Sequence, residues 1–287
     1  MRVLVTGAAG QLGGDVCLAL QRAGHIGIAA SRGGAVPLDI TDPPSVAQTL
    51  DRVAPDAVVN CAAWTGVDAA ENDVDGAYLA NAIGPRVLAA GCAARGTLLT
   101  HLSTDFVFDG QATAPVDEWS EVRPLGVYGA SKLAGEQEVR TLCPRHQVVR
   151  TAWLYGRDGP NFVLTMLRLA RERGHLRVVS DQRGSPTWTG HLAPAIVRLL
   201  ELGVPGTYHL VNSGQASWHE FAQAIVDEAG IDVPVEGIST ANYPTPARRP
   251  AYSVLDTRAW RLLGESTLPG WRDGLRAYLE ERRSSGP

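Results

Sequence analysis

A tyrosine and a lysine four residues apart are the side chains in this sequence best suited to chemistry. Tyr128 and Lys132 occur in the string Tyr-Gly-Ala-Ser-Lys. On a helix covering residues 128–140, the two side chains would share one face, one turn apart. The ammonium would then lower the pKa of the phenol from about 10 toward working pH, so that the phenol could act as a general acid or base. A tyrosine is more often structural, so this interpretation needs support from elsewhere in the chain.

The start of the sequence supplies that support. Residues 2–6 form a continuous apolar run typical of a buried parallel strand, and Gly7-Ala8-Ala9-Gly10-Gln11-Leu12-Gly13 follows directly. Gly7 would make the tight turn, Gly10 would admit a pyrophosphate, and Gly13 would allow close helix–strand packing. A helix over 11–23 would point its N-terminus at the phosphates. A nucleotide cradle together with a tuned phenol predicts hydride transfer to or from a carbonyl or alcohol.

The residues after the next predicted strand, 25–30, bear on the choice of cofactor. An acidic residue there would bind the ribose 2′-hydroxyl of NAD, but the chain has Ala30-Ser31-Arg32. Arg32 could pair with the 2′-phosphate of NADPH, or it could be a solvated surface arginine. Asp39 and Ile40 could frame the adenine, although Asp39 could also be an ordinary turn or capping residue. The sequence leaves NADPH and NADH open.

Hydroxyl groups end the strand predicted over 97–103. Ser103 or Thr104 could donate a hydrogen bond to a substrate carbonyl at the functional edge of a parallel sheet. Tyr128 would deliver the proton, Lys132 would hold the nicotinamide ribose, and the cofactor would supply the hydride.

Other candidate residues are less specific. Trp153 follows the strand predicted over 147–151 and could stack on a ligand ring or pack in the core. Arg248 and Arg249 could meet a phosphate or face solvent. The seven histidines are scattered, and H-E-x-x-H and G-x-S-x-G are absent from the sequence, so we expect neither a metal site nor a serine hydrolase.

The alternation of strands and helices predicts an α/β fold. Further strands are expected at 36–40 and 56–61, and a long helix at 74–94. This rhythm indicates a Rossmann-type doubly wound parallel sheet with a smaller C-terminal substrate-binding lobe. We expect residues 1–153 to form the dinucleotide-binding domain and 154–287 mainly the lobe. Segments at about 187–214 and 245–256 are expected to return to the first domain, and 234–250 is expected to be irregular.

Composition narrows the class of protein. The chain has 287 residues and a formal net charge of -4, which disfavours nucleic-acid binding. Its four cysteines are widely separated, which favours a reducing compartment over disulfides. A strand starting at residue 2 leaves no room for a signal peptide, and the apolar runs are too short to span a membrane. We therefore expect a soluble cytoplasmic protein.

Taken together, these motifs resemble the extended short-chain dehydrogenase/reductase superfamily and, within it, the dTDP-4-dehydrorhamnose reductases. The match runs nearly end to end. Its most specific parts are Ser-Thr-Asp-x-Val-Phe-Asp-Gly at 103–110 and Asp-Gln-x-Gly-x-Pro-Thr at 181–187. Further matching segments are 5–13, 38–42, 60–68, 128–132, 150–153 and 249–250.

The resemblance implies reduction of the 4-keto group of a dTDP-activated 6-deoxyhexose, such as dTDP-4-dehydrorhamnose, with NADPH or NADH as donor. By position, Tyr128 is the proton donor, Lys132 its partner and Thr104 the carbonyl-polarising hydroxyl. The expected cofactor-binding residues are Gly7, Gly10, Gln11, Leu12, Gly13, Arg32, Asp39, Ile40, Ala62, Ala63, Thr65, Tyr128 and Lys132. The expected contacts to the dTDP-sugar are Thr104, Asp105, Trp153 and Arg249.

The chain also departs from the pattern of that family. Phe106 replaces a usual tyrosine, Trp64 replaces a smaller or polar ring, and Tyr252 stands where an asparagine is expected near the sugar nucleotide. Some relatives dimerise through magnesium held by glutamates, but Asp15 and Gly190 occupy two of those positions here. We therefore expect no such metal-linked dimer, while a homodimer of another kind and a related 4-keto sugar substrate stay open.

Two other functions are compatible with the same scaffold. A nucleotide-sugar epimerase or dehydratase of the superfamily would regenerate its cofactor within one turnover. A non-catalytic, cofactor-binding regulatory subunit is disfavoured by the intact Tyr128–Lys132 pair.

Overall fold

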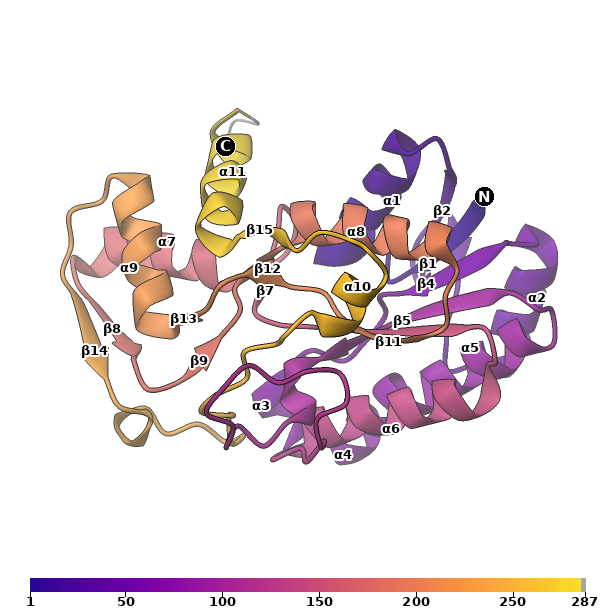
Figure 1. Ribbon diagram of the computed structural model, residues 1–287, viewed down its shortest axis with the longest axis horizontal. Helices are drawn as coiled ribbons and strands as arrows, with labels where there is room; N and C mark the ends of the chain where they lie inside the picture. Colours follow the sequence, from indigo (N-terminus) through magenta and orange to yellow (C-terminus); the bar gives the residue numbers. More distant parts are fainter. Residues whose placement is uncertain (285–287) are drawn as a thin grey trace.

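A seven-stranded, fully parallel sheet forms the centre of the protein (Figure 1). The computed structural model describes residues 1–284. The strand order is β11-β6-β5-β4-β1-β2-β3, and each neighbouring pair is parallel. The strands are β1 (Arg2–Thr6), β2 (Ile26–Ser31), β3 (Val36–Pro37), β4 (Ala57–Asn60), β5 (Leu98–Thr104), β6 (His146–Thr151) and β11 (Gly206–His209). The predicted Rossmann-type fold is confirmed.

Helices cover both faces of this sheet, which is why the central strands β4 and β5 are buried along their whole length. One face carries α1 (Gln11–Arg22) and α8 (Thr189–Leu202), and the other carries α2 (Pro43–Val53), α5 (Gly84–Ala93) and α6 (Val127–Leu142) (Figure 1). Val3 and Val5 of β1 belong to the core on the α1 side, whereas Leu4 belongs to the core on the opposite side. Each face therefore has its own hydrophobic core.

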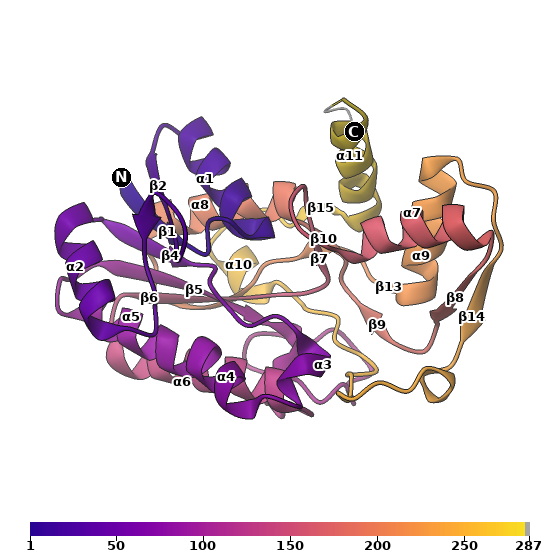
Figure 2. The same cartoon turned by 180° about the vertical axis from the view of Figure 1, so that it is seen from behind.

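The second half of the chain builds a smaller lobe beside the sheet (Figure 2). It contains α7 (Phe162–Arg173), β8 (Leu176–Val179), α9 (Trp218–Ala229) and β14 (Val235–Ile238), which enclose a separate hydrophobic core. We propose the boundary at residue 153, with 187–214 and 245–256 returning to the first domain. The positions of α8 and β11 against the sheet support that division.

The expectation of irregular structure over 234–250 is wrong in part. Residues 235–238 form β14, which pairs in parallel with β8 of the same lobe. The pairing partner lies 59 residues earlier (Val235 with Leu176). Because a strand of four residues is stabilised by this distant neighbour, its local composition, rich in proline, does not reveal it.

The predicted helix over 74–94 is continuous but contains a wider turn. It consists of α4 (Val74–Tyr78), a π-helical turn η1 (Leu79–Ile83) and α5. A π turn inserted in a helix often accompanies a functional site.

The remaining elements are short or lie near the C-terminus. They are α3 (Val67–Ala70), η2 (Asp105–Val107), β7 (Leu154–Tyr155), β9 (Arg183–Gly184), β10 (Thr187–Trp188), β12 (Asn212–Ser213), β13 (Ala216–Ser217), η3 (Thr240–Asn242), α10 (Arg258–Leu262), β15 (Leu268–Gly270) and α11 (Trp271–Ser284). Among residues 1–284, the helices are all too short or too polar to cross a lipid bilayer.

Candidate active site

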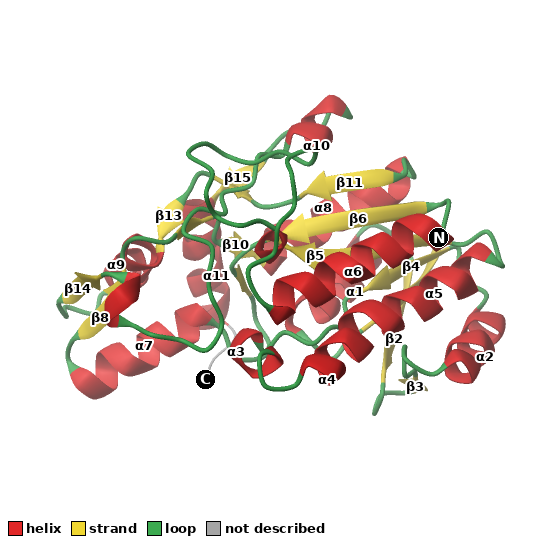
Figure 3. Ribbon diagram, turned by 90° about the horizontal axis from the view of Figure 1, so that it is seen from below, coloured by secondary structure: helices red, strands yellow, loops and turns green. Residues whose placement is uncertain are grey.

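Tyr128 lies in the first turn of α6, which runs along β5 and β6 (Figure 3). The N-cap residue Gly126 offers no side-chain cap, and Glu71 takes that role by accepting a hydrogen bond from the Val127 amide at 2.8 Å. A carboxylate at this end also suits the helix dipole. The Tyr128 ring packs edge-on against Phe106, with centroids 5.5 Å apart. The start of α6, and with it the phenol, is therefore fixed from two directions.

Lys132 lies one turn further along α6 and is buried. Its ammonium donates a hydrogen bond of 2.5 Å to the carbonyl oxygen of Leu102 in β5. Burial lowers the pKa of Lys132 to about 8, while the negative charge of Glu136 acts in the opposite direction. The ammonium is therefore anchored to β5 of the sheet.

The expectation that Lys132 lowers the pKa of Tyr128 is wrong for this structure. Burial raises the pKa of the phenol to about 12, and the charge of Asp105 adds to the rise, while a hydrogen bond with Thr104 opposes it. Burial, and not the charge of Lys132, therefore sets the direction of this shift. The phenol is thus protonated at neutral pH, which is the state that a proton donor requires.

Thr104 ends β5, and its hydroxyl faces several hydrogen-bonding groups. Its oxygen accepts from the Phe106 amide at 3.2 Å, and its proton is directed at Asp105 Oδ1, 3.1 Å away. The other oxygen of Asp105 accepts a short hydrogen bond of 2.6 Å from Ser253. Burial raises the pKa of Asp105 to about 6, although the donors around it act to lower it.

The glycine-rich turn between β1 and α1 has the close contacts expected of a nucleotide cradle. Gly7 has φ +63°, and a Cβ there would lie 2.6 Å from the Ala62 amide nitrogen. A Cβ on Gly13 would lie 2.4 Å from the Gly7 carbonyl oxygen, so only glycine allows this approach of helix and strand. Gly10 is the N-cap of α1 and has no side chain to cover the first amides. The turn therefore leaves a helix N-terminus open to an anion.

The side chains near this turn also fit a bound nucleotide. Among the residues that the structure describes, the buried Nε2 of Gln11 is without a hydrogen-bond partner, a donor that a polar ligand could satisfy. Leu12 is buried in the core, so only its backbone could contact a ligand. Ala62 donates its amide to Asn60 Oδ1 at 3.2 Å, whereas Ala63 and Thr65 are exposed.

The residues that we expected around the adenosine lie together beyond β2. Arg32 is exposed, and its positive charge contributes to a lowered pKa of Asp39, for which hydrogen bonds from Thr41 are the larger cause. Asp39 Oδ1 accepts from both the amide and the hydroxyl of Thr41, so this aspartate does form a turn. Ile40 is buried against Gly84.

Trp153 has a backbone and a ring environment that the sequence does not reveal. Its φ is +48°, a left-handed conformation that costs roughly 1–2 kcal/mol in a residue other than glycine. One face of its ring stacks on Trp218, with centroids 3.5 Å apart and planes at 4°. A Cβ on Gly184 would lie 2.4 Å from Cε2 of the same ring. Trp153 therefore stacks on Trp218, a side chain of the lobe.

Arg249 is bound by the protein itself. Its guanidinium pairs with both oxygens of Asp68, in α3, and also donates to the Thr245 hydroxyl and the Ala247 carbonyl. The neighbouring Arg248 is exposed. Contacts within the chain thus hold the loop before Pro250 against the first domain.

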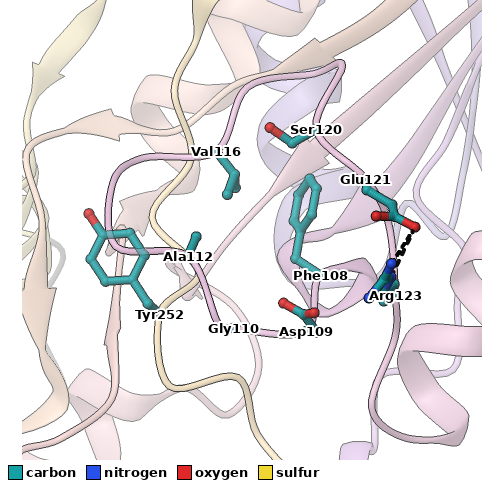
Figure 4. A pocket seen from close by; sticks show the side chains of 9 residues that line it. All are labelled: Phe108, Asp109, Gly110, Ala112, Val116, Ser120, Glu121, Arg123 and Tyr252. Carbon is teal, nitrogen blue, oxygen red and sulfur yellow. Dashed lines mark hydrogen bonds and ion pairs between the residues drawn. The ribbon is translucent and has the colours of Figure 1, made fainter.

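A cavity of about 260 Å³ lies where the segment after η2 meets the chain around Tyr252 (Figure 4). Its lining includes Phe108, Asp109, Tyr252 and the ion pair between Glu121 and Arg123. Tyr252, at the position where an asparagine is usual, donates from its hydroxyl to Gln215 at 3.0 Å. This side chain therefore links the cavity wall to the lobe.

The sequence reasoning missed two buried residues that support the site. Asn81, in η1, accepts from the Trp64 amide at 2.9 Å and donates to both the Trp64 carbonyl and the Ser131 hydroxyl. Glu136, on α6, accepts from Ser103 and is ion-paired with Arg150 and with Arg140. An isolated polar residue in a helical pattern was the available signal for both.

The structure also bears on metal binding. Across residues 1–284, it brings together no three of the histidine, cysteine, aspartate and glutamate side chains in a group that could hold a metal ion.

Comparison with known proteins agrees with this geometry. The model of the RmlD substrate binding domain family matches residues 1–284. The spore coat polysaccharide biosynthesis protein SpsK of Bacillus subtilis is 44% identical, and the alignment covers 99% of each chain. The dTDP-4-dehydrorhamnose reductase of Mycobacterium tuberculosis is 43% identical over 97% of this chain and 92% of the relative.

A solved structure gives the same result for the whole molecule. The dTDP-4-dehydrorhamnose reductase of Bacillus anthracis, determined in complex with NADP, has a TM-score of 0.94 and 40% sequence identity. The match covers 98% of this chain and 99% of that one. The arrangement of the glycine turn, α6 and the end of β5 is therefore that of an established enzyme fold, and the chain belongs to the dTDP-4-dehydrorhamnose reductase family.

Proposed function

We propose that this protein reduces the 4-keto group of a dTDP-4-keto-6-deoxyhexose, most simply dTDP-4-dehydrorhamnose to dTDP-rhamnose, with NADPH or NADH as the reductant. The observation that carries the proposal is that Tyr128 and Lys132 of α6 lie against the end of β5, where Thr104 is located, in a chain of this family. The NADP complex of the Bacillus anthracis relative supports the choice of cofactor.

Each residue of the candidate site has a separate role in the proposed reaction. Bound NADPH or NADH supplies the hydride that reaches C4 of the sugar. Tyr128 donates the proton that the carbonyl oxygen takes up, since burial keeps its hydroxyl protonated. Thr104 donates a hydrogen bond to the same oxygen, and Lys132 binds the nicotinamide ribose from its anchored position. Addition of the hydride to C4 and of the proton to the carbonyl oxygen converts the ketone into an alcohol.

The remaining candidate residues have binding roles in this proposal. Gly7, Gly10, Gln11, Leu12 and Gly13 bind the pyrophosphate. Arg32, Asp39 and Ile40 hold the adenosine end of the cofactor, with Ala62, Ala63 and Thr65 along its length. Asp105, Trp153 and Arg249 are proposed to face the dTDP-sugar, Arg249 through the loop that its ion pair holds in place.

The decisive experiment measures net oxidation of NADPH by dTDP-4-keto-6-deoxysugars, with NMR of the C4 configuration in the product. One NADPH should be consumed per sugar reduced. An epimerase or dehydratase would convert sugar with no net oxidation, and that result would overturn the proposal.

A variant of the proton donor tests the mechanism. Tyr128→Phe should retain the contact with Phe106 and the affinity for NADPH, but its kcat should fall at least about a hundredfold. Tyr243→Phe, at an exposed tyrosine, is the matched control and should keep normal activity. Near-normal turnover in Tyr128→Phe would exclude the phenol as proton donor.

A further inference from the structure

A buried row of three side chains connects the C-terminal part of the chain to the hydroxyl beside the phenol. Ser253 Oγ donates to Asp105 Oδ2 at 2.6 Å, and Thr104 Oγ1 donates to Asp105 Oδ1 at 3.1 Å. Ser253 and Thr104 are 149 residues apart in sequence, and all three side chains are at least 94% buried. Water therefore cannot readily replace any of these contacts.

Ser253 is held in place by its backbone. Its amide donates to the carbonyl of Arg183 in β9, and the Arg183 amide donates to the carbonyl of Ala251. On the other side, the Tyr252 amide donates to the carbonyl of Gly110. Arg183 is also ion-paired with Glu220 of α9. The Ser253 hydroxyl thus has a fixed position between the lobe and the segment that follows β5.

We propose that Ser253 is a positioning residue for the reduction, because through Asp105 it determines where the Thr104 hydroxyl directs its proton. The inference rests on the proposed function, in which Thr104 polarises the carbonyl. A threonine hydroxyl has one proton, and here two acceptors compete for it, Asp105 and the oxygen of Tyr128 or of a ketone beside it. An ionised Asp105 takes that proton, and Thr104 then has none to donate to the substrate.

Protonation of Asp105 reverses this arrangement. Ser253 already donates to Oδ2, so the incoming proton sits on Oδ1 and faces the oxygen of Thr104. The carboxylic acid then donates to Thr104, whose own proton turns to the carbonyl. Ser253 therefore selects the carboxyl oxygen that carries the proton.

Hydroxyl groups surround the Asp105 carboxyl group. β5 and the segment around Ser253 present hydroxyls to it, and α6 presents the phenol of Tyr128, the titratable group to which its charge is coupled. Burial raises the pKa of Asp105 to about 6, and the Ser253 hydrogen bond acts against that rise. The change in the protonation of Asp105 therefore lies within the pH range in which enzymes are usually assayed.

The test compares Ser253→Ala with Ser253→Thr and with Ser180→Ala, a control at a serine of the lobe whose hydroxyl donates to the Ile238 carbonyl. The pKa of Asp105 is measured by ¹³C NMR of its carboxyl carbon, and kcat/KM is measured from pH 5 to pH 8. In the wild type, kcat/KM should rise about tenfold as the pH falls from 7 to 5. Ser253→Ala should move both midpoints upward by about one pH unit, because a donor to the charged carboxylate is lost.

The other variants make the result specific. Ser253→Thr should restore both midpoints, and Ser180→Ala should leave them unchanged. Asp105→Asn should give a flat profile from pH 5 to pH 7, below the titration of Lys132, because its amide donates to Thr104 at every pH. An unchanged Asp105 pKa in Ser253→Ala, or a normal pH profile in Asp105→Asn, would overturn the inference. Failure to reduce any dTDP-4-keto sugar would instead refute the proposed function. In that case, the NMR titration would still test whether the hydrogen bond from Ser253 lowers the pKa of Asp105.

Discussion

Arg249 and Asp68 form a two-point ion pair across 181 residues of sequence. Nη1 lies 3.1 Å from Oδ1 and Nη2 lies 2.8 Å from Oδ2. The hydrogen bonds from Arg249 are the main cause of a lowered pKa of Asp68, and burial acts in the opposite direction. The pair joins α3 of the first domain to the loop that leads to Ser253, so its proposed effect on substrate binding is exerted by both residues together.

That relationship predicts non-additive effects on substrate affinity. Asp68→Asn and Arg249→Ala should each raise KM for the dTDP-sugar about two- to fivefold, the range expected of a partly exposed ion pair. The double variant should be no worse than the more damaging single one, because the two side chains act as a unit. Steady-state kinetics of the three variants provides the measurement. Additive losses would show that Arg249 contacts the ligand independently of Asp68.

The buried ammonium of Lys132 predicts a pH effect on both rate and stability. With a pKa of about 8, Lys132 loses its charge as the pH rises through that value, so kcat/KM should fall above pH 8. Tyr128, with a pKa of about 12, should add no inflection below pH 10. The unfolded chain holds the Lys132 proton up to about pH 10.4, and the folded state therefore binds fewer protons between 8 and 10.4.

Between pH 8 and pH 10.4, the free energy of unfolding of the wild type should therefore increase relative to that of Lys132→Met. The variant has no titrating group at this position. Urea unfolding of both proteins at pH 7.5 and pH 9.5 measures the difference. The same gap in unfolding free energy at both pH values would contradict a lowered pKa.

Gly184 leaves room for the indole ring of Trp153 because it has no side chain. Gly184→Ala would place a Cβ within 2.4 Å of the indole, which must shift, and the stacking on Trp218 should weaken. We expect a loss of about 1–3 kcal/mol in stability, a raised KM for the dTDP-sugar and unchanged NADPH affinity. Near-ultraviolet circular dichroism reports the paired indoles directly. Gly33→Ala is the control, since a Cβ there meets open space. An unaltered dichroism signal in Gly184→Ala would argue against this contact.

The proposed role of Arg32 predicts that its loss affects the affinity for NADPH and for NADH differently. Arg32→Ala should weaken binding of NADPH more than that of NADH, because only NADPH carries the 2′-phosphate. Titration of protein fluorescence with each cofactor measures both dissociation constants. Arg171→Ala, on α7 of the lobe, should change neither. Equal losses for the two cofactors in Arg32→Ala would remove Arg32 from the 2′-phosphate site.

The parts of the fold that sequence could predict are those with local causes. The turn from Gly7 to Gly13 requires glycine at fixed positions, and the apolar periodicity of residues 162–173 is that of an amphipathic helix, which the structure contains as α7 (Phe162–Arg173). The spacing of Ser217 and Glu220 is likewise typical of a capping box, and the structure contains that capping box at the start of α9.

The features that sequence could not predict depend on distant neighbours. The pKa of Tyr128 is governed by burial, which spacing from Lys132 does not reveal. The stacking of Trp153 on Trp218 and the row from Ser253 to Thr104 each join segments that only the folded chain brings together. Residue types alone gave the candidates, but their electrostatic states follow from tertiary packing.

The π turn at Leu79–Ile83 means that this helix holds one residue more than a regular α-helical path would. Each residue of an α-helix advances the direction of its neighbours by about 100°. Deleting a single residue here would therefore restore a regular α-helical path between α4 and α5, and it would move the Asn81 amide away from Trp64 and Ser131. A one-residue change in the length of this turn would therefore break the hydrogen bonds that join the loop around Trp64 to α6.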